Sequence, residues 1–141
     1  MAIVGQKPVL TQEMTMTMIE TCVHKANELG IAVNIMVMDD GGNPKGFLRM
    51  DKASLIGQKI AHNKAYTAVG FGIPTSEWYS KIKDKPELQG IAHIDNMIIL
   101  GGGLPIYHDS HLIGGIGVSG GTSEQDIICA QAALDALAGR S

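Results

Sequence analysis

The sequence predicts an α+β fold in which helices pack against a five-stranded, mainly antiparallel sheet. Short apolar runs of strand length follow one another across tight, glycine-rich turns, and these connections are too short for the crossovers that parallel strands need. Helical patterns precede, interrupt and follow the runs. No linker, repeat or change in composition divides the chain, so residues 1–141 are predicted to form one domain.

The first half of the chain predicts a helix, a strand hairpin and a second helix. Thr11 opens the first helix, whose apolar positions recur at helical spacing, and Gly30 ends it. The run IAVNIMVMDD predicts a strand, and the turn sequence DDGGNPKG returns the chain antiparallel through KGFLRM. The second helix is predicted from about Ser54 to Val69.

The second half predicts three short strands between a broken helical region and a final helix. The sequence FGIPTSEW ends the second helix, and Thr75 or Ser76 can cap a short third one, after which KDKPELQG is predicted as a loop. Strands are predicted around residues 96–100, 104–107 and 112–119. The last helix is predicted from Thr122 to Leu137, with Gly139 as its cap.

Composition and charge exclude several classes of protein. The net charge of −3, without a basic patch, argues against a nucleic-acid partner. No apolar run approaches the roughly 20 residues that a membrane span needs, and the N-terminal segment lacks the apolar core of a signal peptide. We therefore expect a cytoplasmic protein without a membrane partner. Cys22 and Cys129 both fall in predicted helices and suggest no disulfide framework.

Glycines cluster near the C-terminus in the sequence GIGVSGGTSEQD, which contains G-x-G-x-x-G. A dinucleotide site is not supported, because the chain ends 21 residues after Gly120 and leaves no room for the second strand of a βαβ unit. Thr122 and Gln125 fit a capping box, and the acidic residues of that first helical turn would repel phosphate. The glycines can instead admit a flat ligand, or a closely packed helix or subunit, and the sequence leaves these alternatives open.

Five motifs occur in order along the chain. They are D-D-x-G from Asp39, R-M-D-x-A from Arg49, K-A-x-T-A from Lys64, G-G-x-P from Gly102 and G-x-G-V-S-G-G from Gly115. This pattern resembles the GlcG/HbpS family, which also includes the C-terminal domain of PduO-type proteins, and the resemblance covers residues 11–137.

The resemblance implies a profilin-like α+β domain that assembles into a homo-oligomer. Some members of the family bind haem, and the domain is often labelled haem-degrading. Others are associated with glycolate or diol metabolism without an agreed activity. This chain departs from the pattern at Lys52, where many relatives have glycine, and the added charge would narrow the mouth of a ligand pocket.

Lys64 is the candidate catalytic residue. Its helical face is shared with small and apolar residues, so partial desolvation would prepare its amine for a carboxylate ligand or for amine chemistry. The alternative is a lysine whose stem covers the sheet while its ammonium reaches water. Arg49 and Asp51 share a strand face, where they can pair with each other, or Arg49 can hold a propionate or small carboxylate. Asp51 or Ser54 can also cap the second helix.

The histidines and Ser119 add no metal or hydrolase site. His108 and His111 lie in a tight turn without a third ligand, which indicates an exposed turn and no metal site. Any of the five histidines can supply an axial ligand to haem, and the absence of C-x-x-C-H excludes covalent attachment. No histidine follows Ser119, as a nucleophile elbow would require.

Three functions are compatible with these observations. The preferred one is a small-molecule-binding domain that holds haem or a related tetrapyrrole non-covalently against the glycine-thinned strands. The first alternative is an enzyme acting on a small hydroxy- or oxo-carboxylate or a diol-pathway metabolite, oriented by Lys64 or Arg49. The second is a structural oligomer subunit whose glycine strands pack between chains. The predicted ligand-binding residues are Arg49, Asp51, Lys64, Gly102, Gly103, Pro105, Ser119, Gly120 and Gly121.

Overall fold

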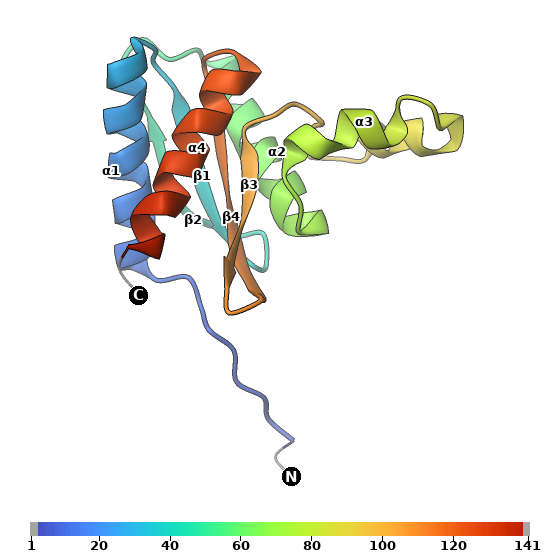
Figure 1. Cartoon of the computed structure of the whole chain (residues 1–141), viewed down its shortest axis with the longest axis horizontal. Coiled ribbons are helices and arrows are strands. Elements are labelled where there is room, and N and C mark those ends of the chain that lie inside the picture. The colour runs from blue at the N-terminus through green and yellow to red at the C-terminus, as the bar shows by residue number, and fades with distance from the viewer. Residues whose placement is uncertain (1–2, 140–141) are drawn as a thin grey trace.

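The computed structural model describes residues 3–139, which form three layers (Figure 1). Helices α1 and α4 cover one face of a central sheet, and α2 covers the other. The elements are α1 (Gln12–Leu29), β1 (Asn34–Asp39), β2 (Pro44–Arg49), α2 (Ile56–Phe71), the 3-10 helix η1 (Thr75–Glu77), α3 (Trp78–Ile82), the 3-10 helix η2 (Pro86–His93), β3 (Gly103–His108), β4 (His111–Ser119) and α4 (Ser123–Ala138).

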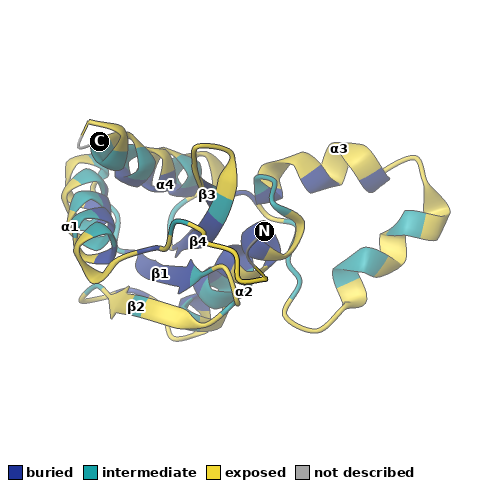
Figure 2. Ribbon diagram, turned by 90° about the horizontal axis from the view of Figure 1, so that it is seen from below, coloured by how far each residue is buried: buried dark blue, intermediate teal, exposed yellow. Residues whose placement is uncertain are grey.

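The sheet has four strands in the order β2-β1-β4-β3, and every neighbouring pair is antiparallel. The α+β class and the antiparallel pairing are confirmed, but the prediction of five strands is wrong. Strands β2 and β3 form the two edges, and β2 is exposed along most of its length (Figure 2).

The missing strand is the one predicted around residues 96–100. Its backbone bonds to a side chain of α2, because the Thr67 hydroxyl accepts a hydrogen bond from the Ile98 N–H at 3.0 Å and donates one to the Asn96 carbonyl. Asn96 also has a left-handed backbone, with φ of 67°, which interrupts an extended run. These bonds replace the strand ladder that the apolar sequence suggested.

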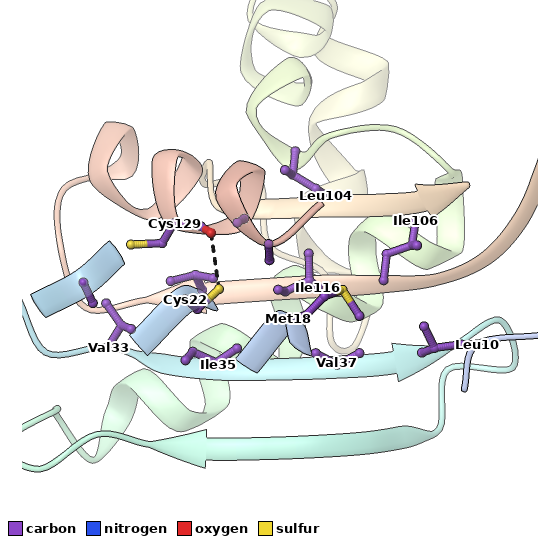
Figure 3. Packing of buried hydrophobic residues seen from close by; sticks show 14 of the residues in the cluster. Leu10, Met18, Cys22, Val33, Ile35, Val37, Leu104, Ile106, Ile116 and Cys129 are labelled. Carbon is purple, nitrogen blue, oxygen red and sulfur yellow. Dashed lines mark hydrogen bonds between the residues drawn. The ribbon is translucent and has the colours of Figure 1, made fainter. Parts of the chain in front are cut away.

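The strands alternate between two hydrophobic cores. On β1, Ile35 and Val37 belong to the larger core under α1 and α4, whereas Met36 and Met38 belong to the smaller core under α2. Figure 3 shows the larger core, in which the Cys22 thiol donates to the Cys129 carbonyl oxygen at 3.2 Å. Both cysteines are buried and free.

The predicted ends of α1 and α4 are confirmed by their caps. The Thr11 hydroxyl accepts from the Met14 N–H, and Gly30 closes α1 with a left-handed backbone. At α4, Thr122 and Gln125 form the predicted capping box. Neither Thr75 nor Ser76 caps α3, because the Thr75 hydroxyl instead accepts from the Gly103 N–H at 2.9 Å.

Replacing Thr122 by alanine is expected to lower the free energy of unfolding by about 1 kcal/mol, because it removes the side-chain acceptor of the α4 capping box. Urea denaturation followed by circular dichroism measures the change. Ser123→Ala, one residue further along and exposed, is the control and should stay within about 0.5 kcal/mol of wild type. Equal losses in both variants would contradict a capping role.

Residues 72–101, called the arm here, project from the layered body (Figures 1 and 2). The arm contains η1, α3 and η2, the last in part of the segment that was predicted as a loop. Trp78 packs edge-on against Phe71 of α2, with ring centroids 4.6 Å apart, and fixes the base of the arm. Among residues 3–139, no helix combines the length and the apolar character that crossing a bilayer demands.

Candidate functional site

At Gly103, Gly115 and Gly117 of β3 and β4, the space of the missing side chain is filled from within the chain by α2. A Cβ atom at Gly117 would overlap the Ala61 carbonyl oxygen and lie 2.6 Å from the Ala65 nitrogen. A Cβ atom at Gly103 would overlap the Lys64 carbonyl oxygen. These glycines let the helix backbone approach the sheet closely, so the open strand surface on which we expected a flat ligand is covered by α2.

Lys64 ends in a buried polar network rather than in a pocket or in water. Its ammonium donates to the Val118 carbonyl oxygen at 2.9 Å and to the Asp126 carboxylate at 3.0 Å. The side chains of Lys64 and Asp126 are each only 3% exposed. Gly102 makes room for this pair, because a Cβ atom there would lie 2.8 Å from the Lys64 ammonium. The pair links α2 to the first turn of α4. It passes the position of Gly102, where the chain has no side chain that would block the contact.

Burial raises the pKa of the Asp126 carboxyl above its ordinary value, because the charged form loses its hydration. The Lys64 ammonium and the Gly121 N–H, which donates to Asp126 at 2.8 Å, oppose that rise. Sequence reasoning missed this role of Asp126 and assigned the residue only to the helix dipole. The partners lie 62 residues apart, so no local spacing indicated the pair.

Arg49 and Asp51 are exposed at the end of β2 and in the turn that follows. Within residues 3–139 the two side chains form no ion pair with each other. Asp51 does not cap α2, since the Ser54 hydroxyl accepts the hydrogen bond from the Gly57 N–H at 3.1 Å. Of the two predicted caps, Ser54 is the one that the structure supports.

The remaining predicted ligand-binding residues are spread over the end of the sheet. Ser119 is buried opposite Asn34 on β1, and Pro105 is half-buried on the edge strand β3. Gly120 is exposed with φ of 153°, a backbone that other residues rarely adopt. None of the nine predicted residues lines the groove described below or the smaller hollow beside Tyr79 and Leu100. Their role in ligand binding stays a prediction.

A surface hollow of about 370 Å³ forms a groove between the start of α1, the end of β3 and the end of α4. We call it the α1–β3–α4 groove. Its walls are mainly apolar, with polar groups from α1 and β3 at intervals. The lining residues are Thr11, Glu13, Met14, Thr17, Ile106, Tyr107, His108, Leu134, Leu137 and Ala138.

His108 is the one imidazole among the groove's lining residues. It shares a strand face with Leu104 and Ile106, which pack into the core under α1 and α4. Tyr107 lies on the opposite face, and its hydroxyl donates to the Gly72 carbonyl oxygen at 2.7 Å. The sequence placed His108 in an exposed turn and counted it among five histidines that could bind haem, without choosing between them. The alternation of His108 with Leu104 and Ile106 was the sequence signal that could have predicted that the three residues share one face of the strand.

The fold and this groove define a small α+β domain with an apolar groove at one end of its helical layer. The chain belongs to the family described as "Haem degrading protein HbpS-like", whose sequence model matches residues 10–135. The resemblance to GlcG, HbpS and the C-terminal domain of PduO is therefore confirmed.

Solved structures support this assignment over nearly the whole chain. The crystal structure of Klebsiella pneumoniae protein ORFY is 36% identical, with a TM-score of 0.94, and covers 100% of this chain and 99% of that one. A crystal structure described as a PduOC:heme complex is 31% identical, with a TM-score of 0.87, and covers 92% of this chain and 95% of that one.

A longer relative contains a similar region. The corrinoid adenosyltransferase PduO of Salmonella typhimurium is 34% identical over 117 residues, which are 82% of this chain but 35% of that protein. The chain thus spans about a third of PduO. Among residues 3–139, no group of three or more His, Cys, Asp or Glu side chains is placed to hold a metal ion.

Proposed function

We propose that this protein binds haem or a related tetrapyrrole non-covalently in the α1–β3–α4 groove, with His108 as the protein ligand to the iron. The observation that carries the proposal is an apolar groove with a single imidazole in its wall. The family description and the PduOC:heme complex of a relative supply the ligand class.

The lining residues fit such a ligand. A volume of about 370 Å³ lies toward the lower end of the range of small-molecule sites, so a tetrapyrrole would be partly enclosed and partly exposed. Met14, Leu134 and Leu137 would cover its apolar ring. When bound, haem would supply an iron centre, which the His108 imidazole would hold.

The His108 imidazole is accessible for such a role. Its side chain is 53% exposed, and its Nε2 contacts the still more exposed Asp109 carboxylate at 3.4 Å. Contacts of this kind between exposed groups are weak and easily exchanged. Thr17, on the groove wall, offers a hydroxyl that would bond a propionate of the ligand.

A haemin titration of the purified protein is expected to give a shifted Soret band that saturates at one haemin per chain. His108→Ala should weaken binding at least tenfold or change the band position, because the iron loses its imidazole. His111→Ala is the matched control, since it removes an exposed imidazole from the same hairpin without touching the groove. Additive, featureless spectra, or identical titrations of both variants, would contradict the proposal.

The same titration distinguishes haemin binding in the groove from haemin binding at the site predicted at the end of β4. Ser119 does not line the groove, so Ser119→Ala should leave haemin binding unchanged. A loss of binding in that variant, with His108→Ala unaffected, would favour the site predicted from the sequence. The alternative of an enzyme oriented by Lys64 has less support, because the Lys64 ammonium is buried and already paired.

A further inference from the structure

Strand β2 leaves backbone hydrogen-bonding groups open along one edge of the sheet (Figure 2). The Met50 N–H donates to the Val33 carbonyl oxygen at 3.0 Å, and these residues continue the register of β2 with β1 as a bonded pair. Bonded and non-bonded pairs alternate along an antiparallel ladder. Phe47 and Arg49 therefore fall in non-bonded pairs, so their N–H and carbonyl groups face away from β1, toward the open edge.

The opposite edge of the sheet, formed by β3, is blocked. Of the β3 residues whose backbone faces outward, Gly103 donates its N–H to the Thr75 hydroxyl at 2.9 Å, and Pro105 has no N–H to donate. Within residues 3–139, no hydrogen bond from outside the sheet reaches the backbone of Phe47 or Arg49. An unpaired strand edge of this kind is a template for another extended chain.

The side chains beside the open edge are basic and aromatic. Phe47 lies opposite Met36, so its side chain is on the α2 face of the sheet, and alternation places Arg49 on the same face. Helix α2 packs over β1, β4 and β3 and leaves β2 exposed. Phe47 is 39% exposed, and Lys45 and Arg49 on either side of it are exposed and form no ion pair within residues 3–139.

We propose that β2 is a docking edge for an extended acidic segment of another protein, which adds a strand beside it. The backbone of that segment exchanges hydrogen bonds with the outward groups of Phe47 and Arg49. Residues directly opposite in an antiparallel pair share a face, so an apolar side chain opposite Phe47 has acidic neighbours opposite Lys45 and Arg49. The recognised pattern is acidic-x-apolar-x-acidic.

Charge makes a second copy of this chain a poor occupant of the edge. In an antiparallel pair of two β2 strands centred on Phe47, Lys45 of each copy lies opposite Arg49 of the other, and like charges directly opposite destabilise the pair. No two acidic residues of the sequence are four positions apart, so no segment of the chain has the recognised pattern. The two cations thus oppose self-pairing and favour an acidic partner.

A capped peptide of sequence TETVTET tests the inference, because its glutamates and its valine share one face of a strand. Titration of the wild-type protein, followed by amide chemical shifts, is expected to saturate at one peptide per chain. The peptide TTEVETT has the same composition but places its glutamates on the face opposite valine. It should bind roughly tenfold more weakly, because two cross-strand ion pairs are lost. A dissociation constant above about 1 mM for TETVTET, or equal affinities of the two peptides, would overturn the inference.

Charge reversal tests the role of the two cations. Lys45→Glu combined with Arg49→Glu should bind TETVTET roughly tenfold more weakly and gain affinity for the peptide TKTVTKT. Lys81→Glu with Lys83→Glu makes the same charge change in the arm and should bind TETVTET as the wild type does. Circular dichroism checks that the variants fold. The wild type tests the same rule without any substitution, because it should prefer TETVTET to TKTVTKT, and an equal or reversed preference would contradict the proposal.

Amide hydrogen exchange locates the bound peptide. The Phe47 and Arg49 amides are expected to exchange rapidly in the free protein and roughly tenfold or more slowly with saturating TETVTET, whereas the Leu48 amide, already bonded to β1, should change little. Protection that exists without peptide and disappears on dilution would show a second copy on the edge and would refute the inference. Saturating haemin should leave peptide binding unchanged, because the α1–β3–α4 groove lies beside the other edge strand, so the inference does not depend on haem binding.

Discussion

Replacing Lys64 by methionine is expected to lower the free energy of unfolding by about 3–5 kcal/mol. The substitution keeps most of the side-chain volume but leaves the Asp126 carboxylate, 3% exposed, without its cation. The Val118 carbonyl oxygen also loses the donor that lies 2.9 Å away. An uncompensated buried charge costs far more than a lost surface contact, and chemical denaturation in urea measures the difference.

A matched control and a double variant separate the cost of the unpaired carboxylate from the cost of altered packing. Lys59→Met makes the same change at an exposed position of the same helix and should stay within about 0.5 kcal/mol of wild type. Lys64→Met combined with Asp126→Asn removes both charges and should recover at least half of the loss, because the neutral amide can still accept from the Gly121 N–H. If the double variant is as unstable as the single one, the loss comes from packing and not from the unpaired carboxylate.

The stability of Lys64→Met should also depend on pH in a defined direction. Burial raises the pKa of Asp126, and without Lys64 one of the opposing effects is absent. The folded state then keeps a proton that the unfolded state has already released. Its free energy of unfolding should fall as pH rises from the ordinary aspartate value of 3.8 to the raised folded pKa, and level off above it. Lowering the pH through that window should therefore narrow the gap to the wild type.

This network bears on the hypothesis of an enzyme that uses Lys64. A loss of turnover in Lys64→Ala would be expected from unfolding alone, because this substitution leaves the buried Asp126 carboxylate without its cation. Stability must be measured before any such loss is assigned to chemistry. Arg49, exposed and outside the network, is the better probe of carboxylate binding.

The helices were predictable because local chemistry marks their ends. Thr11 and Gly30 bound α1, and the capping box at Thr122 opens α4, through contacts that span only a few residues. The hairpin of β1 and β2 was predictable for the same reason, since its turn is dense in glycine and aspartate. The run at residues 96–100 has the composition of a strand, but its hydrogen-bond partner, Thr67, lies about 30 residues earlier. Composition cannot report such a distant partner.

The candidate site was less predictable because its residues come from distant elements. The groove joins the start of α1, the end of β3 and the end of α4, and no motif links these segments. The glycine motif, by contrast, was visible but ambiguous, because missing side chains admit a ligand and a helix equally well. The close approach of Ala61 and Ala65 to Gly117 resolves that ambiguity in favour of the helix.

Gly117→Ala is expected to lower the free energy of unfolding by about 3 kcal/mol or more, at or above the upper end of overpacking effects. The added methyl group would overlap the Ala61 carbonyl oxygen and crowd the Ala65 nitrogen. Both atoms belong to the backbone of α2, so neither can rotate away as a side chain would. The helix must move off the sheet, which opens the smaller core around Met36 and Met38. Thermal and urea denaturation would both report the loss.

Gly70→Ala provides the matched control, because a Cβ atom at this helical position meets nothing within 4 Å. There the substitution should stabilise the protein by about 0.5–1 kcal/mol through the lower conformational entropy of the unfolded chain. The two glycine-to-alanine substitutions are expected to change the free energy of unfolding in opposite directions, because of packing within one chain. If the β4 glycines packed between subunits instead, Gly117→Ala would dissociate the assembly, whereas the isolated subunit would keep its stability. That result would restore the interpretation of the glycine strands as a subunit interface.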